Sequence, residues 1–198
     1  MGQREDLTGR RLQSIIDAAY RCLVRDGYTN VSIKDIAREA GVAPGLLHYY
    51  FESKEQLLVA VVREVMNRQR DEFFDQLRQF QDLKQGVTAS IAWIENRARE
   101  DPAWFVLLFE LYTLSLRDEH IRVEVRTMLQ EEHAVLAEAI SAMLGAHPEK
   151  TGLEPEALAA LALAVFDGLL LHAMIDPTVD PAQDLLVLAR AMTALLSA

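Results

Sequence analysis

The sequence predicts an all-α fold of about nine helices, and two observations support this. Apolar residues recur at helical spacing through nearly all of the 198 residues, and no segment shows the apolar–polar alternation typical of a strand. Prolines and glycines interrupt the helical pattern at intervals that suit helices of ordinary length. Because 51% of the residues are hydrophobic, the chain has enough apolar side chains to form a core.

The first predicted helix carries an apolar stripe that includes Ile15, Ala19 and Leu23. Thr8 precedes this stripe and is the predicted N-cap. Gly27 follows it, and glycine suits the left-handed conformation that ends many helices. We therefore expect a helix between these two residues.

A second, short helix is predicted to run from Ser32 to about Ala40 and to stop at Gly41. Ser32 and Asp35 have the spacing of a capping box, in which each side chain bonds the other residue's backbone N–H. Val31 and Ile36 occupy the two positions of a hydrophobic staple.

The third helix is predicted to open at Pro44, because a proline at the first helical position sacrifices no intrahelical hydrogen bond. Ala43 is a poor cap, so this helix start is expected to depend on tertiary packing. The helix ends near Phe51, and a capping pair at Ser53 and Gln56 then opens a long helix reaching Phe80. Further starts are predicted at Pro102, Pro155 and Pro181, and stops at residues 145–148 and 176–177.

The net charge of −10 is distributed unequally along the chain. Residues 1–55 contain eight basic and eight acidic side chains, so the whole acidic excess lies in residues 56–198. This asymmetry permits contact with nucleic acid at the N-terminal end, while phosphates would repel the remainder. We divide the chain at this point into an N-terminal domain, residues 1–55, and a C-terminal domain, residues 56–198.

Several functional classes are excluded by motifs that the sequence lacks. It has no phosphate-binding glycine loop, nucleophile elbow or zinc-binding histidine pair, so we expect neither an enzyme nor a cofactor. Its single cysteine, Cys22, precludes an intramolecular disulfide. The N-terminus has no apolar signal segment, and no stretch of about 18 uncharged apolar residues occurs, so we expect a cytoplasmic protein without a membrane helix.

Residues 31–56 contain two short amphipathic helices joined by a glycine turn, which is the pattern of a helix-turn-helix. The segments Ser32–Ala37, Ala40–Val42, Gly45–Phe51 and Ser53–Leu58 resemble the signature of TetR-type repressors, and the similarity is nearly continuous over residues 10–58. Farther along, it is limited to length, helix number and the stretch Phe166–Leu169. Two departures stand in the motif: His48 where the family often has Tyr, and Ala43–Pro44 where a polar pair is common.

The resemblance implies a homodimer in which the last two long helices of each chain pair, and each N-terminal domain reads half of a palindromic operator. The sequence supports this independently. Residues 158–175 are apolar on nearly every side, as are residues 185–195, and such helices need a partner. We therefore expect a dimer formed through residues 154–198.

The predicted DNA contacts differ in role. Ser32, at a helix start, and Lys54 suit phosphates, while Tyr49 and Tyr50 suit sugar and phosphate. His48 can donate to a base edge, and Ala43, Pro44, Gly45 and Leu46 can meet a thymine methyl group. Leu47 and Phe51 are expected in the core. For Tyr50, the alternative to a DNA contact is packing in the core. Arg10 and Arg11 either contact phosphate or simply form a solvated helix start.

Aromatic side chains concentrate in the C-terminal domain, where they favour a pocket for a small organic molecule. The expected ligand-binding residues are Trp93, Trp104, Phe109, Tyr112, His133 and His172, with Glu110 and Asp167 as further polar candidates. The acidity of this domain favours a neutral or cationic ligand. The sequence thus predicts a DNA-binding regulator, a repressor released by its ligand. The alternative is a helical regulator or interaction module that binds no ligand.

Overall fold

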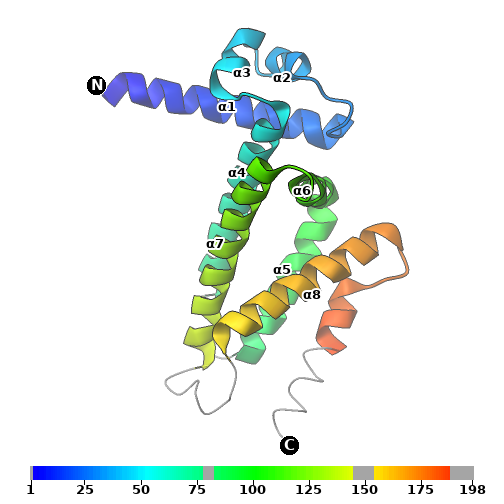
Figure 1. Ribbon diagram of the computed structural model, residues 1–198. Helices are drawn as coiled ribbons and strands as arrows, with labels where there is room; N and C mark the ends of the chain where they lie inside the picture. Colours follow the sequence, from blue (N-terminus) through cyan, green and yellow to red (C-terminus); the bar gives the residue numbers. More distant parts are fainter. Residues whose placement is uncertain (1, 78–82, 145–153, 188–198) are drawn as a thin grey trace, which may run out of the picture. The chain divides into compact units, whose positions relative to one another are not determined.

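The computed structural model describes residues 2–77, 83–144 and 154–187, and these are almost entirely helical, with no strand among them. The helices are α1 (Gly2–Asp26), α2 (Ile33–Glu39), α3 (Pro44–Tyr50), α4 (Lys54–Leu77), α5 (Leu83–Glu100), α6 (Pro102–Ser115), α7 (Glu119–Leu144) and α8 (Pro155–Ile175). Residues 181–187 form a further helical segment (Figure 1). The predicted all-α fold is confirmed.

The chain forms two compact units. The first comprises Met1–Arg68 with Ala103–Arg126, and the second comprises Gln69–Pro102 with Thr127–Ala198. These units group the helices that pack together, whereas the predicted division at residue 55 separates the helix-turn-helix from the rest of the chain. That division stays a prediction.

Within the first unit, α1, α2, α3 and the start of α4 form what we call the headpiece (Figure 1). Helix α2 contacts both α1 and α3. The fully buried side chains of the headpiece are apolar: Ile15, Ala18, Ala19, Cys22, Ile36, Ala37, Leu47, Leu57 and Leu58. Because α2 and α3 have only seven residues each, their stability must come from this shared core rather than from helix propensity.

The ends of α1 and α2 follow the predicted local chemistry, with one exception. Gly27 has φ 77° and Gly41 has φ 66°, the left-handed conformation expected after each helix. Thr8 is not a cap, because α1 begins at Gly2 and passes through it. Acidic residues Glu5 and Asp6 precede Thr8, and negative charge near a helix N-terminus stabilises it, which accounts for the earlier start.

The capping box at the start of α2 is complete. The Asp35 backbone N–H donates to Ser32 Oγ at 3.2 Å, and the Ser32 N–H donates to Asp35 Oδ2 at 3.0 Å. The Ser32 hydroxyl also donates to that carboxylate at 2.5 Å. These bonds with Ser32, followed by the bond from Arg38, lower the pKa of Asp35.

The starts of later helices agree with prediction in most respects. The N–H of Gln56 donates to Ser53 Oγ at 3.2 Å, but the Gln56 side chain accepts from Glu52 N–H rather than from Ser53. Helices α6 and α8 begin at their prolines, and Asp180 caps the segment at 181–187 by accepting from Gln183 N–H at 3.1 Å. Phe80 and the predicted stop at 145–148 lie outside the described residues.

In the second unit, α7 and α8 share a small apolar cluster of Ala137, Ile140 and Ala159, against which Leu136 and Leu158 pack. Helix α8 has a mean hydropathy of 2.1 in its most apolar window, so by length and composition it is able to cross a membrane. The core helix of a soluble protein has the same length and composition, so this finding does not overturn the expectation that the chain has no membrane helix. Only 11% of that window is buried, so an apolar surface is left uncovered on the single chain.

The capping box gives a direct test of how the headpiece is held. Ser32→Ala removes the oxygen that accepts from Asp35 N–H, and we expect it to lower the free energy of unfolding by about 1 kcal/mol. Urea denaturation followed by circular dichroism measures the loss. Ser32→Thr keeps the hydroxyl and is expected to retain most of the stability. Equal losses in both variants would show that the cap contributes little.

Candidate nucleic-acid interface

The turn between α2 and α3 is fixed by backbone hydrogen bonds. Val42 N–H donates to the Ala37 carbonyl at 2.9 Å, and Leu46 N–H donates to the Ala43 carbonyl at the same distance. Ala43 is the N-cap of α3 and makes no side-chain cap bond, with Pro44 following at the first position of the helix, as predicted. The left-handed Gly41 between them completes a helix-turn-helix.

The outer side of α3 is exposed and carries little charge. The exposed residues are Ala43, Pro44, Gly45, His48 and Tyr49, the last with 79% of its surface accessible. Leu46 is half-buried. Leu47 and Phe51 are buried, at 0% and 8% exposure, which confirms their prediction as core residues. The exposed surface of the helix-turn-helix at these residues therefore combines small side chains with His48 and Tyr49 and contains no Lys, Arg, Asp or Glu.

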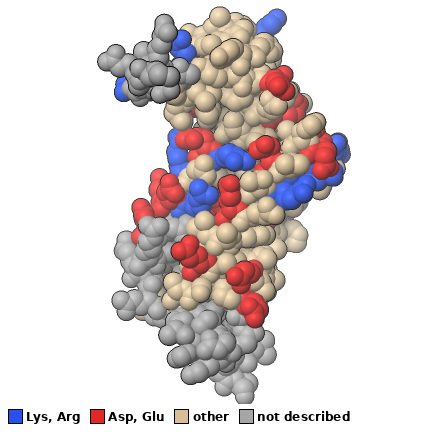
Figure 2. Space-filling view, turned by 60° about the vertical axis from the view of Figure 1, so that its left-hand side comes forward, with Lys and Arg blue, Asp and Glu red and all other residues tan. Residues whose placement is uncertain are grey.

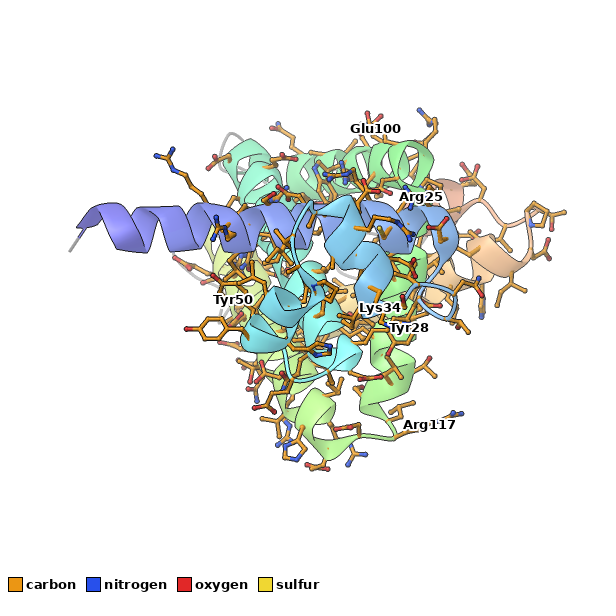
Figure 3. The ribbon with its side chains drawn as sticks, turned by 90° about the horizontal axis from the view of Figure 1, so that it is seen from above. Arg25, Tyr28, Lys34, Tyr50, Glu100 and Arg117 are labelled. Carbon is orange, nitrogen blue, oxygen red and sulfur yellow. The ribbon has the colours of Figure 1, made fainter. Side chains whose placement is uncertain are left out.

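Tyr50 combines features of both of its predicted roles. It is half-buried, and its ring meets Tyr49 edge-on at 5.2 Å and Phe51 at 6.4 Å between centroids. Seen from above the headpiece, Tyr50 lies well apart from Tyr28 and Lys34 (Figure 3). The packing orients the ring without burying it, so a DNA contact by Tyr50 stays a prediction.

Three arginines of the headpiece, Arg21, Arg25 and Arg38, form ion pairs within the protein. Arg21 lies 3.2 Å and Arg25 3.3 Å from Glu39, whose pKa these two bonds lower. Arg38 lies 2.6 Å from Asp35. Figure 2 shows positive and negative side chains interspersed across the middle of the visible face, while its upper part is mostly uncharged. Their charge is thus largely balanced locally, and a smaller number of cations is left for phosphate.

Lys34 is such a cation, and the sequence prediction did not include it. It is exposed in the first turn of α2, and the described part of the chain offers it no ion-pair partner (Figure 3). A lysine two residues after a helix cap is a signal that sequence inspection can use, because it stands beside the free N–H groups of that helix. Lys34 therefore joins the candidates for phosphate contact.

Two predicted phosphate contacts are engaged with the protein itself. The Ser32 hydroxyl and N–H are both directed to Asp35. The Lys54 ammonium donates to the Tyr28 carbonyl and lies 4.1 Å from the centroid of the Tyr28 ring. Nucleic acid would have to compete with these internal partners.

The predicted ligand-binding residues fall into two groups, one in each compact unit. Trp104, Phe109 and Tyr112 belong to the first unit, where Trp104 is 2% exposed and the other two rings lie 6.0 Å apart. Trp93, His133 and His172 belong to the second unit, and His172 is exposed. Each group stays a set of candidates.

The second unit adds two residues that sequence inspection missed. The Phe73 ring lies 5.0 Å from that of Trp93, and Gln69, one turn before Phe73 on α4, is 8% exposed with Nε2 lacking a partner. Burying an amide N–H without a hydrogen-bond acceptor costs free energy. Gln69 had no sequence signal beyond being a polar residue on an amphipathic helix. Among the described residues, no cluster of His, Cys, Asp and Glu is arranged to bind a metal.

Gly45 offers a sharp test of the exposed side of α3. A Cβ atom built there meets nothing within 4 Å, and alanine is the better helix former, so Gly45→Ala is expected to fold at least as stably as the wild type. In the major groove the added methyl group takes space that the backbone needs, and we expect operator affinity to fall about tenfold, as measured by fluorescence anisotropy.

A matched control for Gly45→Ala is Gly9→Ala, which also adds a methyl group in open space on a helix. It is expected to leave operator affinity unchanged. If Gly45→Ala bound the operator as tightly as Gly9→Ala does, α3 would not approach DNA closely at this residue.

Comparison with known proteins agrees with this geometry. Residues 15–61 match the family model for bacterial regulatory proteins of the tetR family, and residues 83–197 match the C-terminal model of BetI-type transcriptional repressors. The HTH-type transcriptional regulator BetI of Rhizobium meliloti is 32% identical over 112 residues, which cover 57% of this chain and 55% of that relative. The chain thus spans little more than half of that protein.

Solved structures share the fold at lower identity. A transcriptional regulator from Saccharomonospora viridis in complex with choline is 22% identical with a TM-score of 0.72, over 90% of this chain and 94% of the other. FadR from Bacillus subtilis in complex with stearoyl-CoA is 21% identical with a TM-score of 0.68, over 93% and 97%. The matched models and relatives are regulators rather than enzymes. This chain belongs to the TetR family of bacterial regulatory proteins and has a BetI-type C-terminal region.

Proposed function

We propose that this regulator is a cytoplasmic, dimeric repressor that leaves a palindromic operator when a small organic cation binds its C-terminal half. The observation that carries the proposal is the sparsely charged outer side of α3, held on a buried core and flanked by cations at α2 and α4. Such a surface fits the major groove, and the flanking groups fit the phosphates beside it.

In this proposal, different residues of α3 make different kinds of contact with DNA. Exposed His48 donates to a base edge, and the small or apolar residues Ala43 to Leu46 meet thymine methyl groups. Tyr49 and Tyr50 bond sugar and phosphate, as do the start of α2 at Ser32 and the start of α4 at Lys54. Because α3 has no arginine to read guanine, a large share of the affinity comes from the backbone contacts, and binding is sensitive to salt.

The dimer is supported by an uncovered stripe on α8. Residues at alternating spacings of four and three share one side of this helix: Ala157, Leu161, Ala164, Gly168, Leu171 and Ile175. Leu161 is 52% exposed, Leu171 39% and Ile175 74%. This spacing is that of the seam by which two helices pair, and the small residues let the helix axes approach closely. A second copy of the chain is expected to cover this stripe, because most soluble oligomers are symmetric assemblies of identical chains.

The stripe predicts which substitution separates the dimer. Leu171→Glu places a charge in the proposed seam, and light scattering at micromolar concentration should then give the mass of one chain, 22.3 kDa, instead of twice that mass. Leu116→Glu is the control, because Leu116 is 75% exposed in the first unit and outside the seam. A wild-type monomer, or a Leu171→Glu variant that stays dimeric, would contradict this interface.

The proposed ligand follows from charge and from the aromatic pair of the second unit. Phe73 and Trp93 pack against each other with their ring planes tilted by 51°, and the faces of such rings attract quaternary ammonium groups. The unpartnered Gln69 Nε2 lies one helical turn away from Phe73 and can donate to a ligand oxygen. Acidic residues outnumber basic ones by ten in residues 56–198, which disfavours a multiply charged anion such as an acyl-CoA. Of the ligands held by the two structural neighbours, choline is therefore the better candidate.

A comparison of choline with its neutral isostere, in which carbon replaces the nitrogen, separates the contribution of ligand charge to binding from that of ligand shape. Choline is expected to bind and to weaken operator binding, because it favours the state with lower DNA affinity. The isostere should bind at least tenfold more weakly, since it lacks the cation–π attraction. Calorimetry measures both affinities, and Trp93→Leu should remove the difference between them.

Equal affinities for choline and the isostere would contradict the cation-binding site. Binding of choline without any change in operator affinity would favour the second candidate function, a regulator whose DNA affinity is independent of a small molecule.

A further inference from the structure

Tyr28, in the loop after α1, makes three contacts with the start of α4. Its carbonyl accepts a hydrogen bond from the Lys54 ammonium. Its ring lies against the same ammonium, with 4.1 Å between Nζ and the ring centroid. Its hydroxyl donates to Glu55 Oε1 at 2.7 Å. All three residues are half-buried and belong to the first unit. One tyrosine thus holds two successive residues of α4.

The bond to Glu55 fixes the ring on which Lys54 lies. This hydrogen bond from Tyr28 lowers the pKa of Glu55, so the carboxylate is charged at neutral pH and accepts strongly. The ring is joined to the backbone at one end and bonded to Glu55 at the other. The Lys54 ammonium therefore rests on a surface whose orientation is set within the protein.

The Lys54 ammonium keeps bonding capacity in this position. An ammonium group has three N–H donors, and the Tyr28 carbonyl accepts from one of them. The attraction of the ring is to the charge as a whole. A phosphate that replaced the carbonyl would compete with it, whereas a phosphate that accepts from another N–H would leave both Tyr28 contacts in place.

We propose that Tyr28 is a positioning residue for Lys54: its carbonyl and ring hold the ammonium ready for a DNA phosphate and so raise the affinity of the regulator for DNA. This inference rests on the proposed phosphate contact of Lys54. A lysine side chain is long and flexible, and ordering it on binding costs affinity. A lysine that is already held loses less conformational freedom. The loop after α1, outside the helix-turn-helix, thereby acquires a role in DNA binding.

The test is a double-mutant cycle of wild type, Tyr28→Leu, Lys54→Ala and the double variant, titrated with operator and random DNA over a range of salt concentrations. Leucine keeps the backbone carbonyl and an apolar side chain but removes the ring. We expect Tyr28→Leu to bind both DNAs about three- to tenfold more weakly, because Lys54 must then be ordered on binding. The slope of log affinity against log salt should stay nearly unchanged, because Lys54 still meets phosphate in the complex. In the Lys54→Ala background, Tyr28→Leu should have no further effect.

Two variants serve as controls. Tyr28→Phe keeps the ring and loses only the hydroxyl, so it should retain most of the wild-type affinity. Tyr20→Leu removes another half-buried tyrosine of the headpiece, on α1, and should leave affinity unchanged. The proposal would be wrong if Tyr28→Phe bound as weakly as Tyr28→Leu, if Tyr20→Leu caused an equal loss, or if the loss in Tyr28→Leu persisted without Lys54.

Nuclear magnetic resonance of the wild type tests the same point without any substitution, which matters if Tyr28→Leu does not fold. The ring current of Tyr28 should shift the ε-methylene protons of Lys54 to higher field. We expect this shift in the free protein and in its operator complex. Its absence from the free protein, or its loss when DNA binds, would show that Tyr28 does not hold the ammonium for phosphate.

Lys54→Ala alone reports on the underlying contact, and it should lower the salt slope by about one unit per half-site. If it leaves affinity and slope unchanged, the phosphate contact of the proposed function fails, whatever Tyr28→Leu does. If it lowers both while Tyr28→Leu does nothing, the contact stands and only the role of Tyr28 is refuted.

Discussion

The helix-turn-helix depends on the burial of three side chains, Ile36, Ala37 and Leu47, in the core of the headpiece. Helices of seven residues are not stable alone in water, and α3 also lacks a side-chain cap. All three side chains are completely buried. Because this packing stabilises α3, the residues on its outer side need not contribute to stability and can suit DNA instead. This accounts for the exposed glycine and the small residues there.

The basic residues of the headpiece also differ in role. Arginines of the headpiece pair with carboxylates of neighbouring residues or of the adjacent helix, so they stabilise helix packing more than they attract phosphate. The cations that suit DNA are few, and one of them, Lys54, is held by internal partners. With few cations available for phosphate, we expect binding to random DNA to be weak.

Sequence alone predicted the features that depend on neighbouring residues. The stops at Gly27 and Gly41 and the start at Pro44 follow from conformations that these residue types favour locally. Thr8 was misjudged because six residues before it also suit a helix. The partners of Lys54 were not predictable, since the Tyr28 carbonyl and ring approach it only through tertiary packing. Aromatic spacing likewise could not distinguish Trp104, which is almost fully buried, from a ring available to a ligand.

The most direct test of the central claim, a dimeric helix-turn-helix regulator, is a hydroxyl-radical footprint on the DNA upstream of its own coding region. The account predicts two equally protected half-sites related by twofold symmetry, with centres one helical turn of DNA apart, about 34–36 Å, or a multiple of it. Each α3 would then lie in a major groove on the same face of the duplex. A single unsymmetrical footprint, or protection no different from that of random DNA, would contradict the account.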